Sequence, residues 1–255
     1  MINRLFSRLE FLLAKKRLRL FKTIYVNFRS LPLYQALKLP IHVYGNVRLL
    51  NLRGSITIHS KIKHGMIHIG HPHNGAAIDT ESLYLQNGGS IHFYGEAHIF
   101  NGASINVFNS GKLVIGDKVI IAEKVRIACV NQIIIGKGSR IAHETQIMDS
   151  NFHYITSIDS REVPNCNGLI TLGEWCWVGN RSSIQKGTII PDYTIVASNS
   201  ITNKDFSNVP SYSIIGGTPA KVLKTGVRRI FDPVLESKIR KHYINHSTMY
   251  KHIES

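Results

Sequence analysis

One histidine stands where a regular sequence pattern breaks off. His153 ends the run Asp149-Ser150-Asn151-Phe152-His153, and the residues that follow it lack the six-residue rhythm found on either side. An imidazole takes up and releases a proton near neutral pH, and a positioned base typically accelerates a reaction by roughly 10²–10⁴-fold. Because functional residues concentrate on loops that a rigid scaffold anchors, His153 is a candidate general base. The alternative is that His153, one of thirteen histidines, merely caps a loop.

Two polar residues close to His153 are candidates for supporting roles in catalysis. Asp149 can orient the imidazole and favour the productive tautomer, as carboxylates do in catalytic triads, but it is also an ordinary residue for a corner of the chain. Asn151 can donate a hydrogen bond to an oxyanion, or it can simply fill the protein interior. The sequence leaves both pairs of alternatives open.

A period of six residues frames these candidates. The first residue of each six is Ile, Leu or Val, the second is mostly Gly or Ala, and the fifth is small, β-branched or short and polar. Eleven sixes follow this pattern: IGDKVI, IAEKVR, IACVNQ, IGKGSR, IAHETQ and IMDSNF before the break, then LGEWCW, VGNRSS, IQKGTI, IPDYTI and VASNSI. Two extra residues, Ile133 and Ile134, separate the third six from the fourth.

This period indicates a triangular coil of eighteen residues with three short strands and three tight corners. The first-position aliphatic and the modest fifth-position side chain fill the interior, and the small second residue lets the chain turn. Successive coils stack at the inter-strand spacing of roughly 4.8 Å. A helix would need apolar residues three and four positions apart, which the sixes do not provide. The predicted fold class is all-β, a parallel β-helix.

The remaining segments complete a three-part organisation. We predict a basic, partly helical segment over residues 1–40, a β-helix over 41–218 with an excursion at about 152–171, and a helical tail over 219–255. Within 41–113 the coils are irregular, with apolar pairs such as Ile67/Ile69 and Leu83/Leu85 between turn residues. Cys176 falls on a fifth position, which predicts a buried, inert thiol.

The net charge of +15 resides mainly at the two ends. Residues 1–30 hold eight Lys or Arg against one acid, and residues 221–255 hold eight against three. Such ends can meet an anionic membrane surface peripherally, or can be the solvated faces of terminal helices. The chain has neither a run of roughly 18 apolar residues nor the apolar stretch of a secretory signal. We therefore expect a cytoplasmic protein, with no nucleic-acid partner because no recognition motif accompanies the charge.

Three motifs, together with the sixes, resemble the hexapeptide-repeat acyltransferases, specifically the polysaccharide and sugar O-acetyltransferases. They are the run Asp149–His153, the restart Trp175-Cys176-Trp177-Val178-Gly179, and the closing Ile215-Gly216-Gly217-Thr218-Pro219-Ala220-Lys221-Val222. The stretch 63–70 is similar to the N-terminal part of capsule-type members, and the whole resemblance covers roughly residues 40–225. It implies a left-handed coil, a homotrimer with active sites between prisms, and acetyl-CoA as acyl donor.

The resemblance also implies roles for particular residues. The acceptor is a hydroxyl of a sugar or glycan precursor, His153 is the base, and no metal is expected. The residues that the resemblance places beside the acyl-CoA are Trp177, Gly179, Ser182, Ala197, Ser198, Gly217, Thr218, Pro219, Ala220, Lys221 and Lys224. The lysines would pair with its phosphates.

Two other functions remain as alternatives. A zinc-dependent carbonic anhydrase on the same prism would need three histidine ligands, and seven histidines precede the clean sixes: His59, His64, His68, His71, His73, His92 and His98. A non-catalytic structural or membrane-surface prism would suit the basic ends but would leave His153 and the closing motif without a purpose.

Overall fold

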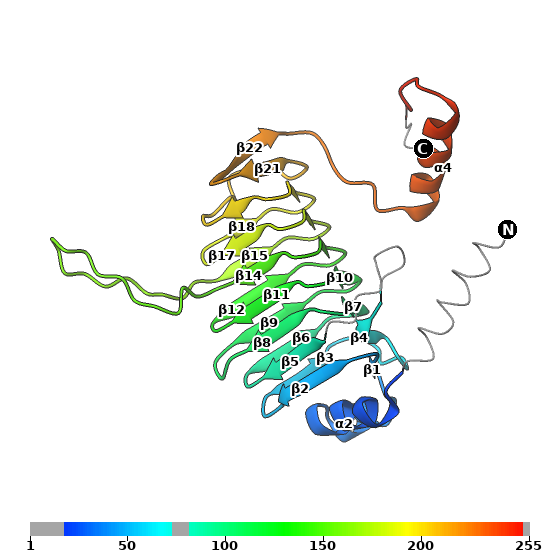
Figure 1. Cartoon of the computed structure of the whole chain (residues 1–255), viewed down its shortest axis with the longest axis vertical. Helices are drawn as coiled ribbons and strands as arrows, with labels where there is room; N and C mark the ends of the chain where they lie inside the picture. The colour runs from blue at the N-terminus through cyan, green and yellow to red at the C-terminus, as the bar shows by residue number, and fades with distance from the viewer. Residues whose placement is uncertain (1–17, 73–81, 252–255) are drawn as a thin grey trace.

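The computed structural model describes residues 18–72 and 82–251. It consists chiefly of stacked coils whose strands form three sheets, one on each face of a triangular prism (Figure 1). The first sheet contains β1 (Ile41–Val43), β4 (Ile67–His71), β7 (Ala97–Phe100), β10 (Val119–Ile121), β13 (Arg140–Ile141), β16 (Trp177–Val178), β19 (Ile195–Val196), β21 (Ile214–Gly217) and β22 (Ala220–Lys224). The second contains β2 (Val47–Asn51), β5 (Leu83–Asn87), β8 (Ser104–Val107), β11 (Arg126–Cys129), β14 (Gln146–Met148), β17 (Ser183–Gln185) and β20 (Ile201–Thr202). The third contains β3 (Ser55–Ile58), β6 (Ser90–Phe93), β9 (Lys112–Ile115), β12 (Gln132–Ile135), β15 (Ile170–Leu172) and β18 (Ile189–Ile190).

Every third strand of the chain pairs with the one above it, so the chain winds repeatedly through the three sheets. Among the described strands, all pairs within the stack are parallel, and only β21 and β22 pair antiparallel. Three helices flank the stack in the described residues: α2 (Leu20–Ser30), α3 (Leu33–Ala36) and α4 (Pro233–Asn245). The fold is the predicted one, a left-handed parallel β-helix with short helices at both ends.

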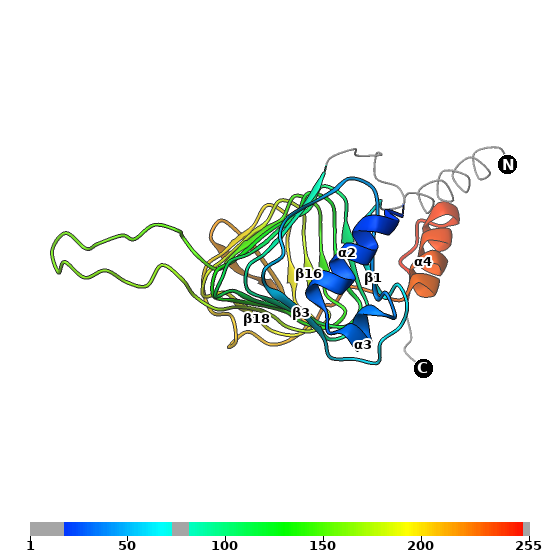
Figure 2. The ribbon, with the colours of Figure 1, turned by 90° about the horizontal axis from the view of Figure 1, so that it is seen from below.

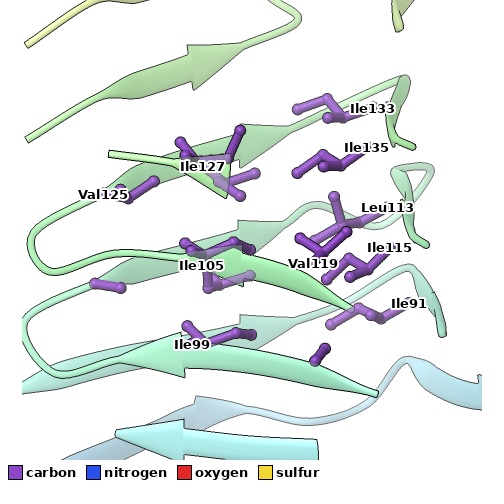
Figure 3. Packing of buried hydrophobic residues seen from close by; sticks show 14 of the residues in the cluster. Ile91, Ile99, Ile105, Leu113, Ile115, Val119, Val125, Ile127, Ile133 and Ile135 are labelled. Atoms are coloured by element: carbon purple, nitrogen blue, oxygen red, sulfur yellow. The ribbon is translucent and has the colours of Figure 1, made fainter. Parts of the chain in front are cut away.

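The interior of the prism is filled by the first position of each six. All eleven first-position residues are at most 1% exposed: Ile115, Ile121, Ile127, Ile135, Ile141, Ile147, Leu172, Val178, Ile184, Ile190 and Val196. Figure 3 shows part of this column, with Ile115, Ile127 and Ile135 pointing into the space between the sheets. The prediction that the first-position aliphatic residue fills the interior is confirmed.

The fifth position is buried as predicted at nine of its eleven occurrences, and Asn131 and Asn151 are the exceptions. Both lie at corners between the second and third sheets, where two extra residues follow Asn131 and the excursion follows Asn151. Ile133, two residues before the first-position Ile135, takes the interior place instead and is fully buried. The insertion therefore moves the inward register by two residues and leaves Asn131 on the surface.

The small second-position residue is needed because the next coil approaches closely. A Cβ on Gly179 would lie 2.6 Å from the backbone nitrogen of Ser198, and one on Gly116 would lie 2.5 Å from that of Lys137. The turn itself is made two residues later, at the fourth position. Nine fourth-position residues have φ between +53° and +78°: Lys118, Lys124, Gly138, Glu144, Trp175, Arg181, Gly187, Tyr193 and Asn199. The small second residue therefore allows the close approach of the next coil, while the fourth residue makes the turn that the second was expected to permit.

The described residues of the irregular coils belong to the same prism. Their inward pairs, including Ile67/Ile69, Leu83/Leu85 and Ile105/Val107, are at most 2% exposed. These residues pair in register with later coils, as Leu85 does with Ile105. The excursion ends slightly earlier than expected, because Ile170 and Thr171 already pair with Ile133 and Ile134 in the third sheet.

The lower end of the stack is covered by the polar side chains of α2. The amide of Asn27 bonds both the N–H and the C=O of Ile41, at 3.1 and 2.7 Å. The hydroxyl of Thr23 accepts from the N–H of Val43 at 3.0 Å, and the N–H of Arg19 donates to the C=O of Val43 at 2.8 Å. The open edge of β1 is therefore fully hydrogen-bonded without a further strand, as an edge strand requires.

The other two sheets are capped by the same segment. Lys22 Nζ donates to the C=O of Val47 in β2 at 2.6 Å, and Gln35 Nε2 donates to the C=O of Ile58 in β3 at 3.1 Å. Figure 2 looks onto this end and shows α2 and α3 lying across it. At the upper end, β22 folds back antiparallel on β21, so Ala220–Lys224 is a strand rather than the start of the expected helical tail. The tail becomes helical only at Pro233, where the Asp232 carboxylate accepts from Val234 N–H at 2.8 Å.

Replacing the capping amide should destabilise the whole prism. Asn27→Ala leaves the N–H and C=O of Ile41 without partners in a buried setting, so we expect unfolding to become easier by about 2–4 kcal/mol. Urea unfolding followed by circular dichroism measures the change. Arg29→Ala, on an exposed residue of the same helix, should change stability by less than about 0.5 kcal/mol. Equal stability of the two variants would contradict the capping role.

Candidate active site

The excursion leaves the prism at the corner between the second and third sheets, after β14, and returns at β15. Its root is clamped: Asn151 N–H donates to Cys166 O at 3.0 Å, and Gly168 N–H donates to Asp149 O at 2.8 Å. Beyond the root the chain projects far from the stack (Figure 1, at the left). His153 is exposed at the start of this arm, and no hydrogen bond of its ring is found within the described part of the chain. The imidazole thus lies on a fixed root and faces solvent.

Asp149 is fully buried at the same corner, and both its carboxylate oxygens accept backbone hydrogen bonds. One accepts from the N–H of Val130 and the other from that of Asn131, each at 2.8 Å. These two bonds hold the corner of the preceding coil beneath the root of the arm. The geometry favours the structural alternative for Asp149 over orientation of His153.

Asn151 lies on the surface rather than in the core. Its backbone N–H is used in the clamp with Cys166, while its side chain is exposed two residues before His153. Of the two alternatives for this residue, the interior one is excluded. A carboxamide so placed can donate to a ligand held near the imidazole.

A second group of predicted residues lines the corner between the first and second sheets. Gly179, Ala197 and Ser198 stack on successive coils, and Ser198 is exposed. The turn between β21 and β22 closes the column: Gly217 N–H donates to Ser200 Oγ at 3.0 Å and Thr218 Oγ1 donates to Asn199 O at 3.4 Å. We call Gly179, Ala197, Ser198, Gly217 and Thr218 the upper corner column. Its small side chains leave backbone groups near the surface.

Other predicted cofactor residues are distributed around this column. Pro219, Lys221 and Lys224 are exposed, the two lysines on β22. Ser182 and Ala220 are buried, and the Ser182 hydroxyl donates to Ala197 O at 3.0 Å. The prediction that these two residues contact a ligand therefore needs correction, because their side chains face the prism interior.

Trp177 lies on the outer face of the first sheet. The segment that contains Arg229 and Phe231, here called the C-terminal strap, covers it. The guanidinium of Arg229 is 4.9 Å from the centre of the Trp177 ring and 5.2 Å from that of Phe231. Phe231 also packs against Trp175, with ring centres 5.3 Å apart. Sequence reasoning missed this strap; the only signal was a Phe and two Arg close together before Pro233. One face of the indole is thus already covered by the chain's own arginine.

Cys176 is fully buried, as predicted for a fifth-position residue. Burial raises the pKa of its thiol to about 12, so at neutral pH it is protonated. Burial likewise raises the pKa of the Cys129 thiol to about 12. Neither sulfur is poised to act as a nucleophile.

Histidines of the early coils form a ladder on the outer face of the first sheet. His42, His68 and His98 occupy the same register on β1, β4 and β7. Burial, and then the proximity of His98, lowers the pKa of His68 to about 4, so its imidazole is neutral near pH 7. No set of three His, Cys, Asp or Glu side chains suited to a metal ion occurs in residues 18–72 and 82–251. His73, which belonged to the zinc alternative, lies outside the described residues.

A hollow lies at the third corner of the triangle. A groove of about 780 Å³ runs along the corner between the third and first sheets, lined by residues such as Lys61, Tyr94, Val114, Ile134 and Lys137. None of the predicted catalytic or cofactor residues lines it. This groove and the predicted site residues therefore lie at different corners of the prism.

His153 and the upper corner column lie on opposite edges of the second sheet. From Thr145 to Asp149 the chain crosses this sheet in four residue steps, about 13 Å at the usual rise of a strand. A general base must come within about 3 Å of the proton that it takes. One prism therefore holds the two halves of the predicted site apart.

Comparison with known proteins adds the following. No family model matches the chain. Among similar solved structures is AntD, an N-acyltransferase from Bacillus cereus in complex with dTDP and 3-hydroxybutyryl-CoA, with a TM-score of 0.44, 16% identity, and coverage of 81% of this chain and 89% of that one. The polysialic acid O-acetyltransferase OatWY has a TM-score of 0.41 and 21% identity, covering 77% and 97%. The polySia-specific acetyltransferase NeuO has a TM-score of 0.37 and 16% identity, covering 82% and 95%.

No helix within the described residues is long and apolar enough to cross a membrane.

The two possible roles of Asp149 predict different defects. Asp149→Asn turns one acceptor into a donor that faces a backbone N–H, so we expect a loss of about 1–3 kcal/mol in stability. If the role is structural, the pH profile of any acyl-transfer activity keeps its shape and only the amount of folded protein falls. Thermal unfolding and a pH–rate profile on the same preparation measure both quantities. A shifted pH profile with unchanged stability would instead assign Asp149 to orienting the base.

Proposed function

We propose that this protein is an acyl-CoA-dependent O-acetyltransferase that modifies a hydroxyl of a sugar or glycan precursor, with His153 as general base. The observation that carries the proposal is the position of His153, exposed at the clamped root of the arm, in the motif that resembles the sugar O-acetyltransferases. The donor half of the proposal rests on the closing Gly-Thr-Pro-Ala-Lys motif and on the column of small residues beneath it.

The proposed chemistry requires a base and no covalent enzyme intermediate. The imidazole of His153 takes the proton of the acceptor hydroxyl as its oxygen attacks the thioester carbonyl. The resulting oxyanion is held by nearby donors, for which the exposed carboxamide of Asn151 is the best placed candidate. Collapse of this intermediate breaks the carbon–sulfur bond, and the thiolate of CoA takes up the proton from the imidazolium. Because the thioester is already activated, the buried thiols have no part.

Acyl-CoA suits the surface of the upper corner column. Pantetheine is a thin chain with two amides, and the small side chains of Gly179, Ala197 and Ser198 leave backbone groups within its reach. Lys221 is exposed opposite Gly216 at the top of the same column, where a point charge can pair with a phosphate, whereas Lys224 lies farther along β22, opposite Ile214. Trp177 contributes to this surface only through the edge that Arg229 leaves uncovered.

We propose a homotrimer because it unites the two halves of the site. With His153 and the upper corner column on opposite edges of the second sheet, the donor and the base meet most directly when the column of one prism faces the arm of its neighbour. The arm supports this arrangement, since it exposes Tyr154, Ile155, Ile158 and Val163 by 55–87%. Apolar side chains so exposed are typical of a contact surface.

The acceptor is proposed as a class only. A sugar hydroxyl of a capsule, lipopolysaccharide or related glycan precursor agrees with the resemblance. A cytoplasmic, membrane-peripheral location belongs to the same proposal, since lipid-linked precursors would be met at the membrane. Contact with that membrane is proposed through the basic segments at the two ends of the chain.

Removing the imidazole should abolish acetyl transfer without unfolding the protein. Release of free CoA from acetyl-CoA, screened against nucleotide sugars and oligosaccharides, should fall by roughly 10²–10⁴-fold in His153→Ala. His59→Ala serves as the matched control, because His59 is also exposed but lies at the lower end of the third sheet. Full activity in His153→Ala, in a preparation whose wild type turns over, would remove the proposed base.

The shared site predicts complementation between two inactive variants. His153→Ala lacks the base, and Ser198→Trp blocks the upper corner column with a bulky group on an exposed position. Each variant alone should be inactive, while co-expressed chains should regain about a quarter of wild-type activity in mixed trimers, where some interfaces join two intact halves. Sedimentation equilibrium checks the mass of three chains. Recovery of no activity, with mixed assemblies present, would show that base and donor come from the same prism.

A further inference from the structure

The helix α2 buries its polar face and exposes its apolar face, the opposite of an ordinary surface helix. Its buried positions, Thr23, Val26, Asn27 and Ser30, are three polar residues and one valine at the spacing of one helix face. Its large apolar residues point the other way, and Phe21 is 88% exposed. The cause is the cap: only polar side chains can bond the open edge of β1, so the polar face must turn toward the prism.

The exposed apolar side chains continue from α2 into α3 and the residue after it. We call this set the N-terminal apolar face; it comprises Leu20, Phe21, Ile24, Tyr25, Phe28, Leu33, Tyr34 and Leu37, exposed by 40–88%. The two helices lie side by side across the lower end of the stack (Figure 2). A continuous apolar surface of this kind marks a site of contact with a protein or a membrane.

The charge of this segment distinguishes a membrane from a second copy of this chain as the partner of the N-terminal apolar face. Residues 18–40 contain no Asp or Glu and four cations, of which Arg19 and Lys22 donate to the carbonyls of Gly45 and Val47 while Arg29 and Lys38 are exposed. Two such faces packed against each other would bring these cations together with no acid from either face, which disfavours a second copy of this chain. An anionic lipid surface complements the same charges, and basic residues beside Phe, Leu and Tyr are typical of helices that lie in the membrane interface.

We propose that the N-terminal apolar face docks this protein onto an anionic membrane, with the axis of the prism upright on the bilayer. The proposal gives the membrane-peripheral location proposed above a defined surface, and its test does not require acetyltransferase activity. Sequence reasoning attributed membrane contact to the basic ends alone; the structure assigns it to the outward face of α2 and α3, with the cations as a rim.

Docking of this kind sets the height of the excursion above the membrane. In the second sheet, β14 lies four strand pairings above β2, the lowest strand. At roughly 4.8 Å for each pairing, the root of the arm is about 20 Å from the capped end. In a trimer with parallel prisms, three such faces would point to one side, and multivalent contact would strengthen binding.

Vesicle binding by the full chain tests the proposal. The probe is sedimentation with vesicles of phosphatidylcholine alone or with about one third phosphatidylglycerol. The wild type should bind the anionic vesicles and be released by salt, since surface charges are screened. The triple variant Phe21→Ser, Leu33→Ser, Leu37→Ser should lose about tenfold or more of its partitioning. Arg29→Gln with Lys38→Gln should weaken binding to anionic vesicles only.

The matched control changes three apolar residues that are equally exposed at the other end of the chain. Val234, Ile244 and Met249 are 64%, 75% and 83% exposed, and their replacement by Ser should leave vesicle binding unchanged. Circular dichroism confirms that each variant is folded. Absence of wild-type binding to anionic vesicles, or equal losses in the control, would overturn the proposal. Unchanged binding of the Phe21 variant would also overturn it and would assign binding to basic residues 4–17, and a fall in assembly mass in that variant would point to a protein contact instead.

Discussion

The structure depends on one constraint, the hydrogen bonding of each strand to the strands above and below it. Because the coils stack along the backbone hydrogen-bond direction, every short strand is satisfied only by its two neighbours. Strands of two to five residues, too short to be stable alone, become part of a continuous ladder. The first and last coils then have open edges, which would attract further strands if they stayed bare. The two ends of the chain are shaped by the need to close them.

At the lower end, side chains of α2 take the place of a further strand. This determines which residues of α2 face outward. Asn27 and Thr23 mimic the backbone donors and acceptors of a missing neighbour, so the polar face of α2 is consumed by the prism. The apolar residues of the same helix have no interior to fill, because the stack of coils ends at this cap. The upper closure is instead made by backbone, through β22. The two ends of the molecule therefore present different surfaces to their surroundings.

The same ladder of backbone hydrogen bonds restricts the candidate functional residues to the corners between the sheets. Strand side chains that point inward fill a narrow core, and those that point outward form flat sheet faces, so only corners can release a loop or expose backbone groups. The excursion with His153 leaves one corner, and the upper corner column with the small residues occupies another. A buried carboxylate, Asp149, anchors the corner of the coil beneath the excursion. These rigid corners and the long arm are the basis for the proposal that a neighbouring prism completes the site.

The six-residue rhythm by itself determined the fold class, the inward residues and the place of the excursion, because all eleven first-position side chains repeat the same local requirement for burial. It also predicted the buried thiol of Cys176. It could not determine the register at Asn131, where two added residues move the interior position to Ile133. Only the tertiary structure decided that Arg229 covers Trp177, that Asp149 bonds two backbone groups, and that α2 turns its apolar face outward. These outcomes depend on contacts between residues far apart in the chain, such as Asn27 with Ile41 and Trp177 with Arg229. A local pattern holds no information about which polar group lies opposite which open edge.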